Sequence, residues 1–100
     1  MSGLNRINTY PYGSTVRLQC SFFDFNGEKI DPTIVRIIIY TSRYEQLLSE
    51  TVGGANRTDI GVYHYDYTTE KKDQRLYYEW YGEIDGKPSL KRGSFMTKFM

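Results

Sequence analysis

The sequence is poor in the residues that build reactive or covalently stapled sites. It contains one cysteine and one histidine among 100 residues, so an intramolecular disulfide is excluded and no zinc site made of several such ligands is expected. Its longest apolar stretch, residues 37–40, is far shorter than the roughly 20 residues of a membrane-spanning helix. Residues 1–10 are polar and lack the features of a signal peptide. These absences predict a soluble protein that is made in a reducing cytoplasm and has no membrane partner.

An excess of one charge is also missing. Thirteen Lys and Arg residues face 12 Asp and Glu residues, which leaves a formal net charge of +1. Proteins that bind a phosphate backbone concentrate positive charge on one surface, so nucleic acid is not expected as a partner.

Aromatic residues are plentiful, at 16% of the chain with ten tyrosines. Large aromatic side chains favour strands over helices, and 100 residues suffice for one hydrophobic core. Apolar and polar residues alternate with period two between turn signals such as Asn26-Gly27 and Asp85-Gly86. About seven strands are expected, and the clearest lie at 15–23, 35–41, 44–52, 61–68, 76–82 and 94–99.

This pattern predicts an all-β fold, an immunoglobulin-like antiparallel β-sandwich. Segment 35–41 is apolar on both faces and is expected at the centre of a sheet. Gly53-Gly54 is expected to close a hairpin, and Trp80 is the best candidate for the centre of the core. The other predicted core positions alternate along the strands: Val16, Leu18, Cys20, Phe22, Val35, Ile37, Ile39, Leu76, Tyr78, Phe95 and Phe99.

Three groups of residues offer chemistry, and a structural interpretation is favoured for each. His64 and Asp66 share a strand face, but a lone histidine beside a carboxylate is most often a surface pair. Cys20 falls on an apolar strand face, where burial raises the thiol pKa and makes it inert. The acidic turn 24–31 superficially resembles a calcium loop, but its spacing does not match an EF-hand. We therefore expect no catalytic residue, no cofactor and no metal, with calcium at the acidic turn left open.

The tyrosines offer a different possibility, since ten exceed what a core of this size can hold with every hydroxyl satisfied. Exposed tyrosine rings supply contact area at low entropic cost, although tyrosines that merely cover a sheet are an equally good interpretation for each ring alone. The candidate interface residues are Tyr77, Tyr81, Tyr10, Tyr12 and Tyr44.

The order of the motifs adds a resemblance to these interpretations. The motifs are YPYGSTVRLQCSFFD, NGEKIDPTIVRIIIY, a Gly-rich hairpin, DIGVYHYDYT, LYYEWYGEIDG and a terminal GSFMTKF. In this order they resemble the small immunoglobulin-like virion structural proteins of tailed bacteriophages, over residues 10–99. A similar order occurs in immunoglobulin-like modules of large bacterial surface proteins.

The resemblance implies a non-enzymatic connector or decoration subunit at the capsid or the head-tail junction. Such a protein would contact capsid, portal or tail components in multiple symmetric copies, in the virion and, during assembly, in the host cytoplasm. The strands run close to both ends of the sequence, which favours one free-standing domain at 10–100 behind a flexible arm at 1–9. The alternative is a free-standing binding module of a surface or carbohydrate-recognising type.

Overall fold

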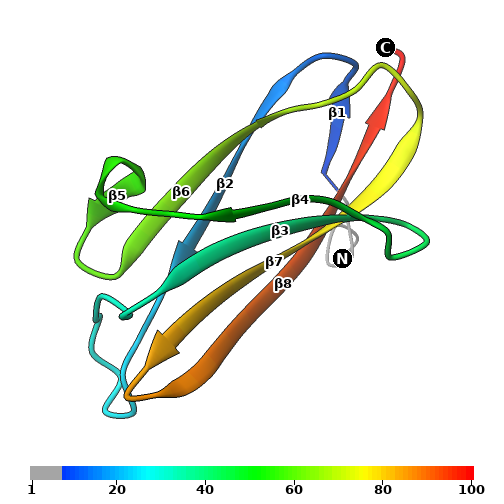
Figure 1. The fold of residues 1–100 in the computed structure, drawn as a ribbon. Helices are drawn as coiled ribbons and strands as arrows, with labels where there is room; N and C mark the ends of the chain where they lie inside the picture. The colour runs from blue at the N-terminus through cyan, green and yellow to red at the C-terminus, as the bar shows by residue number, and fades with distance from the viewer. Residues whose placement is uncertain (1–7) are drawn as a thin grey trace, which may run out of the picture.

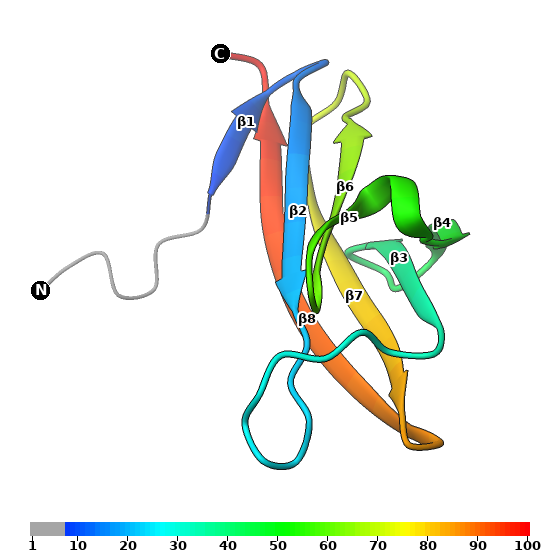
Figure 2. The ribbon, with the colours of Figure 1, turned by 90° about the vertical axis from the view of Figure 1, so that its left-hand side faces the viewer.

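Two β-sheets packed face to face account for most of residues 8–100, which are the residues that the computed structural model describes (Figures 1 and 2). The prediction of an all-β sandwich is confirmed. The described residues form eight strands rather than about seven: β1 (Thr9–Pro11), β2 (Thr15–Ser21), β3 (Val35–Thr41), β4 (Gln46–Thr51), β5 (Arg57–Asp59), β6 (Val62–Thr68), β7 (Gln74–Ile84) and β8 (Lys87–Lys98).

The larger sheet has the order β1-β8-β7-β3-β4, and the smaller one has the order β2-β6-β5. Neighbouring strands are antiparallel, except that β1 runs parallel to β8. β3 lies between β7 and β4, so its predicted central position is confirmed. The predicted arm at 1–9 lies outside the described residues except for Asn8 and Thr9, and Thr9 begins β1.

The core fills the space between the two sheets and follows the predicted alternation closely. Trp80 is 0% exposed and lies among the largest buried side chains. The other buried apolar residues come from both sheets: Val16, Leu18, Cys20, Phe22, Val35, Ile37, Ile39, Val52, Tyr63, Leu76, Ile84 and Phe95. Burial of these side chains supplies the main stabilisation of the fold.

Phe99 was predicted to lie beside Phe95 in the core, and this is wrong. β8 ends at Lys98, and Phe99 is 82% exposed. Thr97 takes the buried position two residues after Phe95. Its hydroxyl donates to the carbonyl of Lys72 over 2.7 Å, which satisfies the buried polar group.

The predicted hairpin at Gly53-Gly54 is also wrong. A short 3₁₀ turn, Gly54–Asn56, follows β4 and leads into β5, which belongs to the other sheet. The glycines therefore mark a crossing between the sheets. The hairpin at Asp85-Gly86 is confirmed, because both residues have positive φ, of 55° and 74°, as a two-residue hairpin turn requires.

Candidate functional site

Tyrosines gather on the outer face of the larger sheet, over β3 and β7. Tyr40 lies directly opposite Tyr77, and Arg36 lies directly opposite Tyr81, so these four side chains share one face. Glu79 stands between Tyr77 and Tyr81 on β7. We call this surface the tyrosine face and define it by Arg36, Tyr40, Tyr44, Tyr77, Glu79, Tyr81 and Arg92.

Tyr44 joins the tyrosine face from the turn between β3 and β4. Its ring stacks on the ring of Tyr77, with centroids 5.5 Å apart and planes inclined by 22°. The side chain is nevertheless 71% exposed. Its φ is 63°, a left-handed conformation that is rare for a bulky residue and that often marks a contact site.

Charged groups border the tyrosine rings. Arg92 on β8 donates through Nε to Glu79 Oε1 over 3.0 Å, and the guanidinium of Arg36 lies 5.9 Å from the centre of the Tyr81 ring. A cation at this distance from a ring centre is attracted to the face of the ring.

A pocket of about 540 Å³ opens at the β3–β4 end of this surface. Such a volume suits a side chain or a small ligand, because ligand pockets measure roughly 300–1,000 Å³. We call it the tyrosine pocket, and its lining residues are Tyr40, Tyr44, Tyr77, Tyr78, Glu79, Arg92 and Gly93.

The five predicted interface tyrosines fall into two groups. Tyr44, Tyr77 and Tyr81 lie on the tyrosine face. Tyr10 instead packs edge-on against Phe95, with centroids 5.9 Å apart, at the margin of the core.

Tyr12, the remaining candidate, lies near the end of β8. Its hydroxyl donates to the carboxylate of Asp73, and its ring lies 5.7 Å from the ring of Phe99. The structure therefore does not bring Tyr10 and Tyr12 together with the other three candidates.

Asp66, one half of the predicted surface pair, is engaged elsewhere. Its carboxylate accepts two hydrogen bonds from Arg17, at 2.8 and 2.9 Å. These bonds are the main reason that the pKa of Asp66 is lowered. His64 Nδ1 lies 2.9 Å from the hydroxyl of Thr58. Cys20 is buried as predicted, and burial raises the pKa of its thiol to about 11.

The acidic turn 24–31 is held by donors from the protein. Asp24 Oδ1 accepts the backbone N–H groups of Asn26 and Glu28, at 2.8 and 3.0 Å. Asp31 accepts from Arg57 and from other donors in β6 and its preceding turn. Residues 8–100 bring no three His, Cys, Asp or Glu side chains together as a metal site.

Sequence reasoning did not identify Tyr40 as part of a site, and it missed the Glu79–Arg92 pair. The Asp85-Gly86 turn could have predicted the pairing of Glu79 with Arg92. A two-residue turn places Ile84 opposite Lys87, and counting back along both strands places Glu79 opposite Arg92. The Tyr40–Tyr77 pairing depends on the register of β3 against β7, which no short turn sets.

The chain matches no protein-family model, no curated protein and no solved structure. Within residues 8–100, no helix is long and apolar enough to cross a membrane.

Proposed function

We propose that this protein is a non-enzymatic virion structural protein of a tailed bacteriophage, a connector or decoration subunit that acts through protein contacts. The observation that carries the proposal is the tyrosine face, where an exposed ring, Tyr44, stacks on Tyr77 beside further half-buried tyrosines of the sheet. Tyrosine and arginine are enriched at the energetic centres of protein interfaces. The capsid, the portal or a tail component is the proposed partner.

The strand order supports an immunoglobulin-like form of the sandwich. Such domains pair strands B, E and D in one sheet and strands C, F and G in the other. In chain order β2, β5 and β6 correspond to B, D and E, and β3, β7 and β8 correspond to C, F and G. β4 lies beside β3, where variable-type domains add a strand. β1 does not join the sheet of B, E and D, because it pairs with β8 in the other sheet.

Co-expression with the products of the flanking genes tests the proposal. The expected result is a stable complex with a capsid, portal or tail component that is lost when Tyr77 and Tyr81 are both replaced by alanine. A matched control replaces Thr15 and Thr68, which are exposed on the smaller sheet. Failure of every flanking product to bind, or loss of binding in the control alone, would contradict the proposal.

The tyrosine pocket favours a second candidate function, a carbohydrate-recognising module. Aromatic rings beside a carboxylate and a guanidinium, as at Tyr44, Glu79 and Arg92, suit the stacking and hydrogen bonding of a sugar ring. Titration with cellohexaose and chitohexaose, followed by the amide resonances of β3 and β7, distinguishes the two functions. Saturable shifts confined to the pocket favour the sugar, and unchanged spectra favour protein contacts.

A further inference from the structure

The loop between β2 and β3 presents an aromatic ring to solvent at one end of the sandwich. Phe25 is 76% exposed, and Figure 2 shows this loop at the same end of the sandwich as the β7–β8 hairpin. An ordered turn holds the ring there. Asp24 donates its N–H to the carbonyl of Glu28 over 2.8 Å, and Gly27 supplies the positive φ, of 84°, that the turn requires. The ring is therefore presented on a defined backbone, which lowers the entropic cost of binding.

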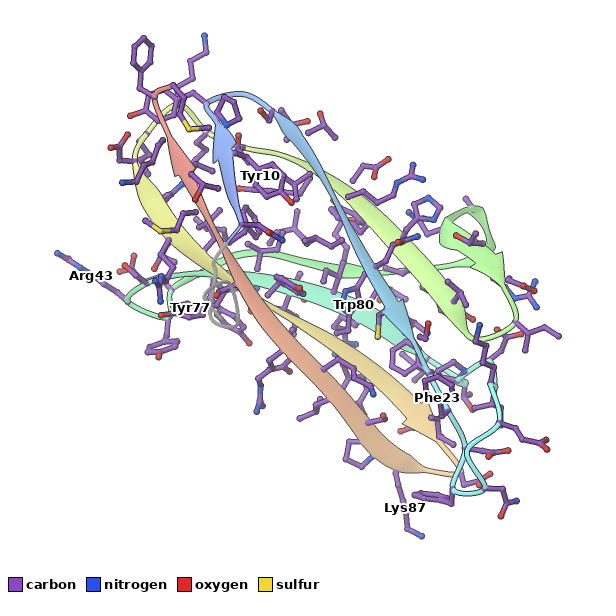
Figure 3. All side chains as sticks on the ribbon, turned by 180° about the vertical axis from the view of Figure 1, so that it is seen from behind. Tyr10, Phe23, Arg43, Tyr77, Trp80 and Lys87 are labelled. Atoms are coloured by element: carbon purple, nitrogen blue, oxygen red, sulfur yellow. The ribbon has the colours of Figure 1, made fainter. Side chains whose placement is uncertain are left out.

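The tyrosine pocket lies on the larger sheet, away from this loop. Tyr77, Tyr78 and Glu79 line the pocket near the middle of β7, whereas Glu83, near the end of β7, forms backbone hydrogen bonds with Thr33 and Ile34 of the β2–β3 loop. Figure 3 shows Tyr77 and Arg43 on the left side of the molecule, and Phe23 and Lys87 at its lower right end. The exposed ring and the pocket of one molecule are therefore far apart, and they can meet only between two molecules.

The two features suit each other in aromatic chemistry and in charge. The pocket is lined mainly by tyrosines, and aromatic rings pack well edge to face or offset against one another. Beside Phe25, the exposed Glu28 forms no ion pair within residues 8–100. Beside Tyr44, the exposed Arg43 is equally unpaired within that part of the chain. Lys29 beside Glu28 and Glu45 beside Tyr44 are also exposed and without an ion pair in residues 8–100. Each apolar feature therefore carries one free charge of each sign, and each charge at the loop can face an opposite charge at the pocket.

We propose that Phe25 of one copy docks in the tyrosine pocket of the next copy, with Glu28 facing Arg43 across the contact. The inference rests on the proposed function and gives it a geometry. Because the two surfaces differ, the contact is heterologous and leaves a free loop at one end and a free pocket at the other. Successive copies then close into a ring or extend as a filament, which are the two outcomes of a head-to-tail interface.

Mixing two variants tests this contact directly. Phe25→Asp removes the ring from the loop, and Tyr44→Gly opens the pocket while suiting the positive φ at that position. Each variant alone should associate at least about tenfold more weakly than the wild type, as expected when a central aromatic contact is lost. The mixture should form a dimer of twice the 11.8 kDa monomer mass, because each variant keeps one intact surface.

The outcomes separate this inference from the proposed function. If Phe25→Asp associates like the wild type while Tyr44→Gly does not, the tyrosine face makes contacts but the head-to-tail geometry is wrong. If the mixture stays monomeric while the wild type associates, the inference is likewise overturned. A wild type that remains monomeric at every concentration also overturns it, whereas binding to a flanking gene product would still support the proposed function.

Charge reversal provides an independent test of the same contact. Glu28→Lys and Arg43→Glu should each weaken association, and the chain that carries both changes should associate like the wild type, since the reversed pair can form again between copies. Glu50→Lys on β4 is the control, because it is exposed and lies away from the proposed contact. A double variant as weak as either single variant would contradict the pairing of Glu28 with Arg43.

Discussion

The ring of Tyr44 stacks on the ring of Tyr77, although Tyr44 must adopt a φ of 63° to reach it. A left-handed conformation costs a residue with a Cβ about 1–2 kcal/mol, and a stacked aromatic pair returns about 0.5–1.5 kcal/mol. The fold alone gains little from this arrangement. Its effect is to hold two tyrosine rings together at the tyrosine pocket.

Tyr44→Gly should leave the free energy of unfolding within about 1 kcal/mol of the wild type, because relief of the strain offsets the lost stacking. Association through the tyrosine face should nevertheless weaken. Urea unfolding measures the first quantity and light scattering the second. Tyr44→Phe is the control, since it keeps the ring. A glycine variant that associates like the wild type would remove Tyr44 from the contact.

Trp80→Ala should lower the free energy of unfolding by about 3–5 kcal/mol, because it leaves a large cavity between the sheets. The side chain is fully buried, and its indole Nε1 has no hydrogen-bond partner within the described residues. Trp80→Phe should therefore cost less, since it keeps a ring and removes the unsatisfied donor. Chemical denaturation of both variants measures the difference. An alanine variant as stable as the wild type would show that Trp80 does not anchor the core.

Gly61→Ala should destabilise the protein more than Gly27→Ala. Both glycines have positive φ, of 72° and 84°, so each substitution should cost about 1–2 kcal/mol in backbone strain. A Cβ at Gly61 would also lie 2.8–2.9 Å from backbone atoms of Phe22 and Ile30, whereas one at Gly27 would meet nothing within 4 Å. Thermal unfolding of the two variants makes the comparison. Equal losses would mean that the backbone around Gly61 can move apart.

Asp31 should make stability depend on acid pH. The pKa of Asp31 is lowered from 3.8 to about 2, mainly by the hydrogen bond from Arg57 and next by the hydrogen bond from the backbone of Gly61. Because the pKa is lower in the folded state, the stabilisation is fully present above about pH 4 and is lost as the pH falls to about 2. The stability gap between the wild type and Asp31→Asn should shrink over that range in urea unfolding. A gap that stays constant would contradict this role.

The sequence predicted best those strands that have one face on the core and the other in solvent. β2 is the clearest case, because Val16, Leu18 and Cys20 alternate with exposed residues. Turn chemistry was equally informative at Asp85-Gly86, where a two-residue loop requires positive φ.

The first half of β8 was missed because its residues lack that alternation. Lys91 lies opposite Trp80 and so shares its face, yet it is exposed, and its ammonium group lies 5.9 Å from the centre of the Phe23 ring. β1 and β5 have three residues each, too few to show any period. The tyrosine pocket depends on which strands are neighbours in the larger sheet. That strand order is a property of the whole fold and not of any short segment.

Light scattering of the purified wild type across a concentration series, with Tyr77→Ala beside it, tests most directly whether the tyrosine face is a contact surface. We expect the mass of the wild type to rise above the monomer with concentration, and we expect the variant to stay monomeric over the same range. A wild type and a variant with the same mass at every concentration would contradict self-association through this face.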